Sequence, residues 1–137
     1  MKCKYNFSVL KNKQIGFETI INNKSYIFSN TLKDVKIKND NITFIFENTF
    51  LVIKNDVFLH LRLYEINNTY IFKDFDNKIV NCLLGFTMFD TFGFPIDLTK
   101  EILEEKGYLL DTNGFEILRN LNKQKSRENS TLSSAFK

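Results

Sequence analysis

Short apolar runs alternate with polar residues through the first part of the chain. Residues 35–38 read V-K-I-K and residues 58–63 read F-L-H-L-R-L, so apolar and polar side chains follow one another with a period of two in the first run and from residue 59 on in the second. Such alternation places successive side chains on opposite faces of a strand. Turn-forming residues recur about every 8–12 positions, which is typical of an antiparallel meander. We therefore predict about six or seven strands between residues 14 and 84.

Pairs of Asn residues stand where the predicted strands end. Asn22 with Asn23, and Asn67 with Asn68, separate neighbouring apolar runs. Asn tolerates positive φ and hydrogen-bonds to its own backbone, and both properties suit tight turns. The strands should therefore form a small barrel or a twisted sheet.

The period changes near residue 85. Pro95, the only proline, suits the start of a helix because its φ is already close to the helical value. Leu98, Ile102 and Leu103 then recur at helical spacing. Gly107 can end this helix in the left-handed conformation.

A second helix is predicted to follow. Asp111 can cap its N-terminus, and Phe115, Leu118 and Leu121 recur on one face. Beyond residue 128 the sequence is polar and predicts a flexible tail.

The predicted elements give an α+β fold: an N-terminal antiparallel β-meander followed by a C-terminal pair of helices. We divide the chain into a β-rich unit of unknown role at residues 1–84, a helical segment at residues 85–128 and the tail at residues 129–137. A length of 137 residues suits one domain or two small units.

Composition and charge narrow the function classes only a little. The net charge of +3 is compatible with a nucleic-acid partner but too weak to indicate one. Cys3, Cys82 and His60 are too few for a structural zinc site, which needs four ligands. No apolar run reaches the roughly 18 residues that span a bilayer, and no apolar stretch follows the charged N-terminus as in a signal peptide. We therefore expect no membrane contact, no metal ion and a cytoplasmic location.

The helical segment contains a specific motif. Residues 88–99 read M-F-D-T-F-G-F-P-I-D-L-T, which resembles the alanyl-tRNA synthetase segment L-Y-D-T-Y-G-F-P-x-D-L-T. The likeness continues through residues 101–107, 111–116 and 123–127. It covers about residues 86–128 and leaves the first 84 residues outside the resemblance.

The resemblance implies a tRNA-binding role. In the family this stretch closes the helical region that binds tRNA, and that region reads a G·U pair in the acceptor stem of alanine tRNA. We therefore expect alanine tRNA as a partner. A separately encoded synthetase catalytic subunit is a second expected partner if the chain works in a split enzyme.

The parts that would make alanyl-tRNA are absent from the sequence. A class II site in this family holds ATP with arginines on two motif strands, one of them glycine-rich, whereas this chain has only Arg62, Arg119 and Arg127 and its glycines are scattered. The editing activity needs a His/Cys metal site that His60 alone cannot build. We expect no catalytic residue and no cofactor here, since ATP and Mg²⁺ belong to a complete synthetase. The sequence leaves open whether the chain is itself an enzyme or part of one.

Two aspartates are candidate readers of the tRNA. RNA duplexes present a wide, shallow minor groove with the guanine 2-amino group as a donor, and a carboxylate is a natural acceptor for it. The resemblance points to Asp90 first and to Asp97 second. Alternatively, Asp90 caps a turn against the backbone of Thr91 or Gly93, and Asp97 or Thr99 caps the following helix.

Basic and aromatic residues near these aspartates have two interpretations each. Arg119, Lys123 and Arg127 recur four apart along one helix face, with Lys125 nearby, and all four are candidate phosphate contacts. The alternative is an ordinary solvated helix face. Phe92 and Phe94 could stack on a base, but the protein core is the simpler place for them.

Three hypotheses for the function follow. The chain is a tRNA-binding fragment or subunit of an alanyl-tRNA synthetase that recognises the acceptor stem and is not catalytic alone. Alternatively, it is a non-enzymatic β-domain interaction protein, or a gene remnant, with a synthetase-like tail. In the third hypothesis the chain is a diverged synthetase middle region whose first half is helical.

Overall fold

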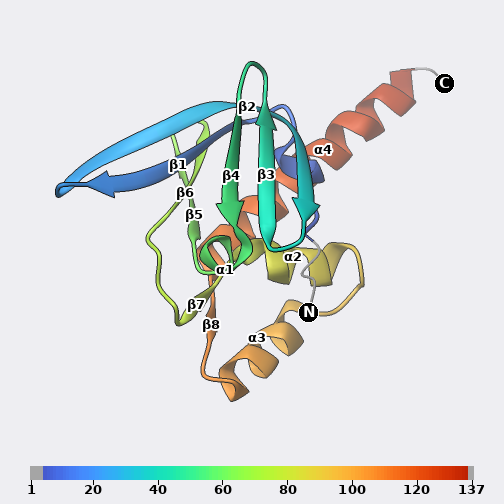
Figure 1. Ribbon diagram of the computed structural model, residues 1–137. Coiled ribbons are helices and arrows are strands. Elements are labelled where there is room, and N and C mark those ends of the chain that lie inside the picture. The colour runs from blue at the N-terminus through green and yellow to red at the C-terminus, as the bar shows by residue number, and fades with distance from the viewer. Residues whose placement is uncertain (1–4, 136–137) are drawn as a thin grey trace.

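Strands make up most of the first half of the described chain and helices most of the second half (Figure 1). The computed structural model describes the backbone of residues 5–135 and the side chains of residues 5–127. In chain order the elements are η1 (Ser8–Leu10), β1 (Gln14–Ile21), β2 (Lys24–Lys38), β3 (Asn41–Phe46), β4 (Phe50–Lys54), α1 (Asn55–Phe58), β5 (Arg62–Ile66), β6 (Thr69–Lys73), β7 (Ile79–Val80), α2 (Cys82–Asp90), α3 (Ile96–Glu105), β8 (Leu109–Leu110) and α4 (Thr112–Ala135). The α+β class expected from the sequence is confirmed, and the helical first half is wrong.

Six strands form one open sheet in the order β4-β3-β2-β1-β6-β5. Neighbouring strands are antiparallel except β1 and β6, which run parallel with Gln14 opposite Thr69 and Phe17 opposite Phe72. Because β4 and β5 are the two edges, the sheet does not close into a barrel. The twisted sheet is therefore the correct alternative, and the parallel pair departs from a simple meander.

The predicted Asn turns are present. Asn22 and Asn23 have φ of 52° and 64° between β1 and β2, and Asn67 and Asn68 have φ of 51° and 61° between β5 and β6. Positive φ at both central residues matches the twist of two-residue hairpins. These turns set the register of both hairpins.

The β1–β2 hairpin projects from the body of the molecule as an arm (Figure 1). β2 is 15 residues long, and its register with β3 shifts between Leu32 and Asp34. A shift of this kind bends a strand, so that its two parts can run in different directions and pair with different neighbours. The second part of β2 pairs with β3, so the part nearer the turn has only β1 as a neighbour.

Residues 58–63 do not form the single strand that their alternation predicted. α1 ends at Phe58, and β5 begins only at Arg62. The Phe58 side chain is fully buried, and its ring lies 4.9–5.8 Å from the rings of Tyr5, Phe7, Phe44 and Phe72. Packing of this aromatic cluster outweighs the local strand pattern.

An additional helix, α2, precedes the two predicted helices. The Asn81 side chain caps it by accepting a hydrogen bond from the Leu83 amide at 2.9 Å, and Asn81 also donates to the Phe58 carbonyl at 3.0 Å. Asn81 is fully buried. The expected boundary at residues 84 and 85 therefore falls inside a helix, and residues on both sides of it share one core.

The two predicted helices are present as α3 and α4. Gly107 ends α3 with a φ of 83°, and the Tyr108 amide donates to the Leu103 carbonyl at 2.9 Å, as in a Schellman motif. α4 continues to Ala135, so residues 129–135, expected as a flexible tail, have helical backbone. Residues 136 and 137 lie outside the described part of the chain.

Candidate nucleic-acid interface

The bend between α2 and α3 follows from two backbone devices. Gly93 has a φ of 72° and donates to the Phe89 carbonyl at 3.1 Å, which ends α2 in the left-handed conformation. Pro95 occupies the N-cap position of α3 with an extended backbone. Phe92 and Phe94, on either side of Gly93, are 56% and 42% exposed, so their assignment to the core is wrong. The bend presents two aromatic rings to solvent.

Asp90 is the last residue of α2, and its carboxylate is exposed. Its Oδ2 accepts a hydrogen bond from Asn6 Nδ2 at 3.1 Å, and its Oδ1 accepts from Asn122 Nδ2 at 3.4 Å. The predicted cap is absent, because the amides of Thr91 and Gly93 donate to main-chain carbonyls of α2. Asp90 therefore joins the N-terminal segment, α2 and α4.

Asn6 is itself fixed by several contacts. Its backbone amide donates to Thr87 Oγ1 at 2.8 Å, and its Oδ1 accepts from the Ser8 amide at 3.0 Å. Its Nδ2 also lies 3.3 Å from Thr91 Oγ1. A carboxylate offers about four lone-pair sites, so Asp90 keeps acceptor capacity after binding Asn6 and Asn122. The result is a positioned acceptor that faces solvent.

The position of Asp90 in its helix adds nothing to helix stability. A helix carries a partial negative charge at its C-terminus, where a carboxylate is unfavourable by about 0.3–1 kcal/mol. Asp97 differs, because it lies in the first turn of α3, where the same effect is favourable. Asp97 is exposed, and no side chain caps α3 by a hydrogen bond, so the predicted caps by Asp97 and Thr99 are wrong.

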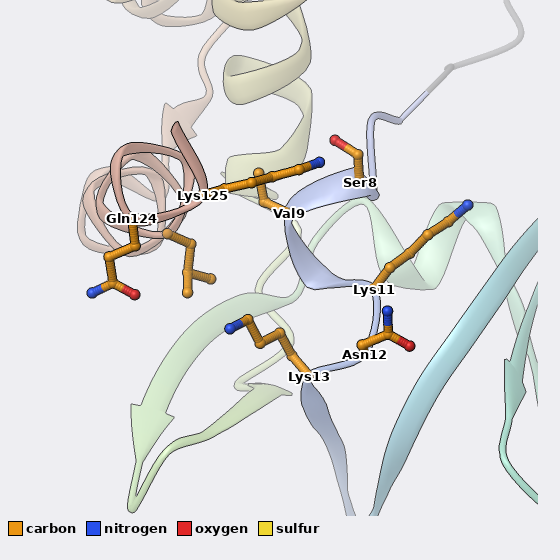
Figure 2. Close-up of a pocket in the computed structure, with 8 residues that line it drawn as sticks. Ser8, Val9, Lys11, Asn12, Lys13, Gln124 and Lys125 are labelled. Atoms are coloured by element: carbon orange, nitrogen blue, oxygen red, sulfur yellow. The ribbon is translucent and has the colours of Figure 1, made fainter. Parts of the chain in front are cut away.

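The predicted basic residues of α4 face two directions. Arg119 and Lys123 are exposed on the outer side of the helix, and Arg119 forms an ion pair with Glu116 at 3.6 Å. Arg127 is also exposed. Lys125 is four residues after the buried Leu121 and so lies on the inward side, where it lines a cleft against η1 (Figure 2).

A second aspartate, Asp111, lies at the start of α4 and is buried. Its Oδ1 accepts from the Gly114 amide at 3.0 Å, which confirms the predicted cap, and its Oδ2 accepts from the Leu63 amide at 2.8 Å. Cys82 is packed beside it and fully buried. Burial raises the pKa of the Cys82 thiol well above its usual value, and the Asp111 charge raises it further. This thiol stays protonated and is part of the structure.

Two kinds of feature are absent from the part of the chain that the structure describes. Within residues 5–135, none of the helices is both long and apolar enough to cross a membrane. The side chains described by the structure contain no group of three or more His, Cys, Asp or Glu placed to hold a metal ion.

The sequence alone did not identify Asn6 and Asn122 as partners of Asp90. Asn6 is 84 positions away from Asp90 in the chain. In a chain so rich in Asn, neither residue stands out, and only the fold brings them together.

Comparisons with known proteins place this chain in a family. The family described as tRNA synthetases class II (A) matches residues 64–137, which is more than half of the chain. The chain is 44% identical over 63 residues to the alanine–tRNA ligase of Christiangramia forsetii and 54% identical over 44 residues to that of Alkaliphilus oremlandii. These matches cover 46% and 32% of this chain.

A longer match reaches the β-rich half. The alanine–tRNA ligase of Buchnera aphidicola is 31% identical over 129 residues, which cover 93% of this chain. The similarity therefore extends beyond the segment at residues 86–128. The three matches cover only 7%, 5% and 11% of those relatives, so the chain spans about a tenth of their length or less. No solved structure matches the chain.

Proposed function

The chain belongs to the alanyl-tRNA synthetase family of class II tRNA synthetases, and from this premise we propose that it binds the acceptor stem of alanine tRNA. In this proposal Asp90 accepts a hydrogen bond from the guanine 2-amino group of the G·U pair. The chain does not catalyse aminoacylation alone.

One observation carries the proposal: Asp90 is exposed at the end of α2, while Asn6 and Asn122 hold its carboxylate in place. A donor aimed at this carboxylate needs no rearrangement of the protein. The shallow minor groove of an RNA duplex brings guanine 2-amino groups within reach of a convex protein surface. The exposed rings of Phe92 and Phe94 lie on the same bend and can contact unpaired bases or sugars beside the stem.

The G·U pair explains why a carboxylate suits this role. In a G·U wobble pair the guanine 2-amino group makes no bond to uracil, whereas in a G·C pair it bonds to cytosine. A hydrogen bond to a charged acceptor contributes about 1.5–3 kcal/mol, and about 1.4 kcal/mol is a factor of ten in affinity. We expect the chain to prefer the G·U stem by about tenfold.

Binding to stem duplexes tests the proposal. Affinity is measured for a G·U stem and for the matched G·C stem with wild type, Asp90→Asn and Asp90→Ala. Asp90→Asn keeps an acceptor oxygen without the charge and should retain part of the preference, and Asp90→Ala should abolish it. Asp40→Ala, which removes an exposed carboxylate from the β2–β3 turn, is the charge-matched control.

Asp97→Ala separates the two candidate readers. If the G·U preference survives Asp90→Ala and is lost in Asp97→Ala, the second aspartate reads the pair. If wild type binds both stems equally, acceptor-stem recognition by this chain is wrong.

We also propose that the chain acts with a synthetase catalytic part, which would supply the ATP and Mg²⁺ chemistry. Adding the chain to the catalytic fragment of an alanine–tRNA ligase should then raise kcat/KM for alanine tRNA by at least about tenfold, as expected when a positioning contact is restored. Unchanged kcat/KM would argue against this partnership.

A protein-interaction role is the second candidate function, and one observation favours it. Ile20 and Ile27 on the β1–β2 arm are 67% and 53% exposed and are diagonal neighbours on one face of the hairpin, whereas Tyr26, 51% exposed, lies on the other face. Exposed apolar side chains that lie together mark interaction sites. Ile20→Thr with Ile27→Thr should then impair stimulation of the catalytic fragment while stem binding remains. In the alternative without RNA recognition, the chain shows no preference for alanine tRNA.

A further inference from the structure

A cleft separates η1 from α4 (Figure 2). Its volume is about 550 Å³, and Val9 and Leu121, both buried, are part of its lining. The Lys125 side chain runs from α4 toward η1, and the Lys13 side chain points back toward α4 and Gln124 (Figure 2). Two ammonium groups from segments more than 100 residues apart in the chain therefore border one opening.

The wall formed by residues 8–13 is fixed by the core beneath it. Leu10 is fully buried, and its amide donates to the Phe7 carbonyl at 2.9 Å. Asn12 has a φ of 66° and donates through its amide to the Leu32 carbonyl at 2.7 Å. With its backbone held in this way, the segment keeps the Lys13 side chain on the solvent side of the core.

The charge around the cleft is positive. Among the residues with described side chains that line it, none carries a carboxylate. Lys11 is drawn away by an ion pair with Asp34 at 3.6 Å, and it points away from α4 (Figure 2). Within the part of the chain whose side chains are described, neither Lys13 nor Lys125 forms an ion pair. Ser8, Asn12 and Gln124 add neutral hydrogen-bonding groups.

The two walls of the cleft are the same two segments that hold Asp90. The Ser8 amide on one wall donates to Asn6 Oδ1 at 3.0 Å, and Asn6 in turn donates to Asp90. Asn122, which also donates to Asp90, lies one helical turn before Lys125 on the other wall. The cleft and the Asp90 carboxylate are therefore bordered by neighbouring residues of the same two segments.

We propose that this cleft binds the phosphodiester backbone of the RNA strand whose base edge meets Asp90. The proposal rests on the RNA-binding role proposed above and extends it to Lys13, in the β-rich half of the chain. A lysine ammonium is a mobile point charge that suits phosphate oxygens, and such contacts fix register without reading sequence. The cleft supplies affinity and alignment, and Asp90 supplies the discrimination.

The double variant Lys13→Gln with Lys125→Gln tests the cleft. Removing two phosphate contacts should lower affinity for the G·U stem and the G·C stem by the same factor, about tenfold or more at low salt. The slope of log K against log salt should fall in magnitude by about one to two. Thermal unfolding of the variant checks that the fold is intact.

Lys24→Gln with Lys106→Gln is the matched control. It removes the same two charges from the β1–β2 turn and from the end of α3, both exposed and remote from the cleft (Figure 1). The control should keep more of the affinity and the wild-type slope. If the two double variants weaken binding equally, only net charge matters and the cleft proposal is overturned.

The outcomes separate this proposal from the proposed function. If wild type prefers the G·U stem and the cleft variant binds both stems like wild type, only the cleft proposal fails. If wild type does not discriminate between the stems but the cleft variant weakens duplex binding, the cleft proposal stands and acceptor-stem recognition fails. If polyglutamate competes as well as RNA at equal charge, the cleft takes acidic peptide and the proposal is overturned.

Discussion

Two aspartates tie α4 to the rest of the molecule, and they do so in opposite ways. Asp111 is buried at the start of α4, and both of its oxygens accept hydrogen bonds from backbone amides. Asp90 is exposed beside the middle of α4, and among the described residues the side chains of Asn6 and Asn122 donate to its carboxylate. The comparison separates a carboxylate that the fold needs from one that is positioned but available to a ligand.

The location of each carboxylate in its helix supports this contrast. Asp111 stands at the N-terminus of α4, where the helix dipole favours a negative charge, and it also satisfies the amide of Leu63 on the edge strand β5. Asp90 stands at the C-terminus of α2, where the dipole disfavours one. Stability explains the first aspartate and does not explain the second.

The largest expected effect comes from Asp111→Ala. It leaves the buried amides of Leu63 and Gly114 without partners, and each such group costs about 1–3 kcal/mol. We expect a loss of about 2–5 kcal/mol in the free energy of unfolding, measured by urea denaturation. A loss below about 1 kcal/mol would mean that the fold does not depend on the Asp111 carboxylate, as we infer for Asp90.

A smaller loss is expected from Gly114→Ala. A Cβ at Gly114 would come within 2.7 Å of the Cys82 sulfur and would clash with the Asp111 carboxylate, so one of them has to move. Overpacking of this kind costs about 1–3 kcal/mol, again measured by urea denaturation. Asn120→Ala, at an exposed position on α4, is the control, and it should cost less than about 0.5 kcal/mol. Equal losses of stability at the two positions would contradict the close packing of Gly114 against Cys82 and Asp111.

A third aspartate, Asp74, tests a smaller contribution to stability. Like Asp90, it is exposed and accepts a hydrogen bond from a side chain. Its carboxylate accepts from the Tyr64 hydroxyl at 2.5 Å, and this hydrogen bond raises the pKa of Tyr64 to about 12 from 10.0. The folded state thus holds the phenolic proton more tightly than the unfolded state. The stability from this bond is fully present below pH 10 and is lost as the pH rises from 10 to about 12.

Tyr64→Phe isolates that contribution. At neutral pH it should lower the free energy of unfolding by less than about 1 kcal/mol, because the bond is exposed. Between pH 10 and 12 the variant should lose less stability than wild type. An identical pH dependence for the two proteins, measured by urea denaturation at each pH, would mean that the bond does not form in solution.

Local patterns in the sequence predicted the fold class and the details that depend on neighbours in the chain. The Asn turns, Pro95 at the start of α3, Gly107 at its end and Asp111 as a cap all follow from backbone preferences of single residues. The sequence missed α2 because its residues are apolar on nearly all sides, and a short apolar run fits a buried strand as well as a helix. Only the buried Asn81 distinguishes the two, through its cap.

Long-range contacts could not be predicted. The parallel pairing of β1 with β6 and the insertion of Phe58 into an aromatic cluster depend on segments far apart in the chain. The same is true of the candidate site, where the motif identified Asp90 but nothing indicated that Asn6 would hold it. Lys13 joins Lys125 at the cleft only because η1 packs against α4.

The most direct test is the ratio of affinities for the G·U and G·C stems in wild type and Asp90→Ala, with unfolding measured on the same samples. We predict a ratio of about ten in wild type, a ratio near one in the variant, and a change in the free energy of unfolding within about 0.5 kcal/mol. An unchanged ratio in a stably folded Asp90→Ala protein would contradict the role assigned to this carboxylate.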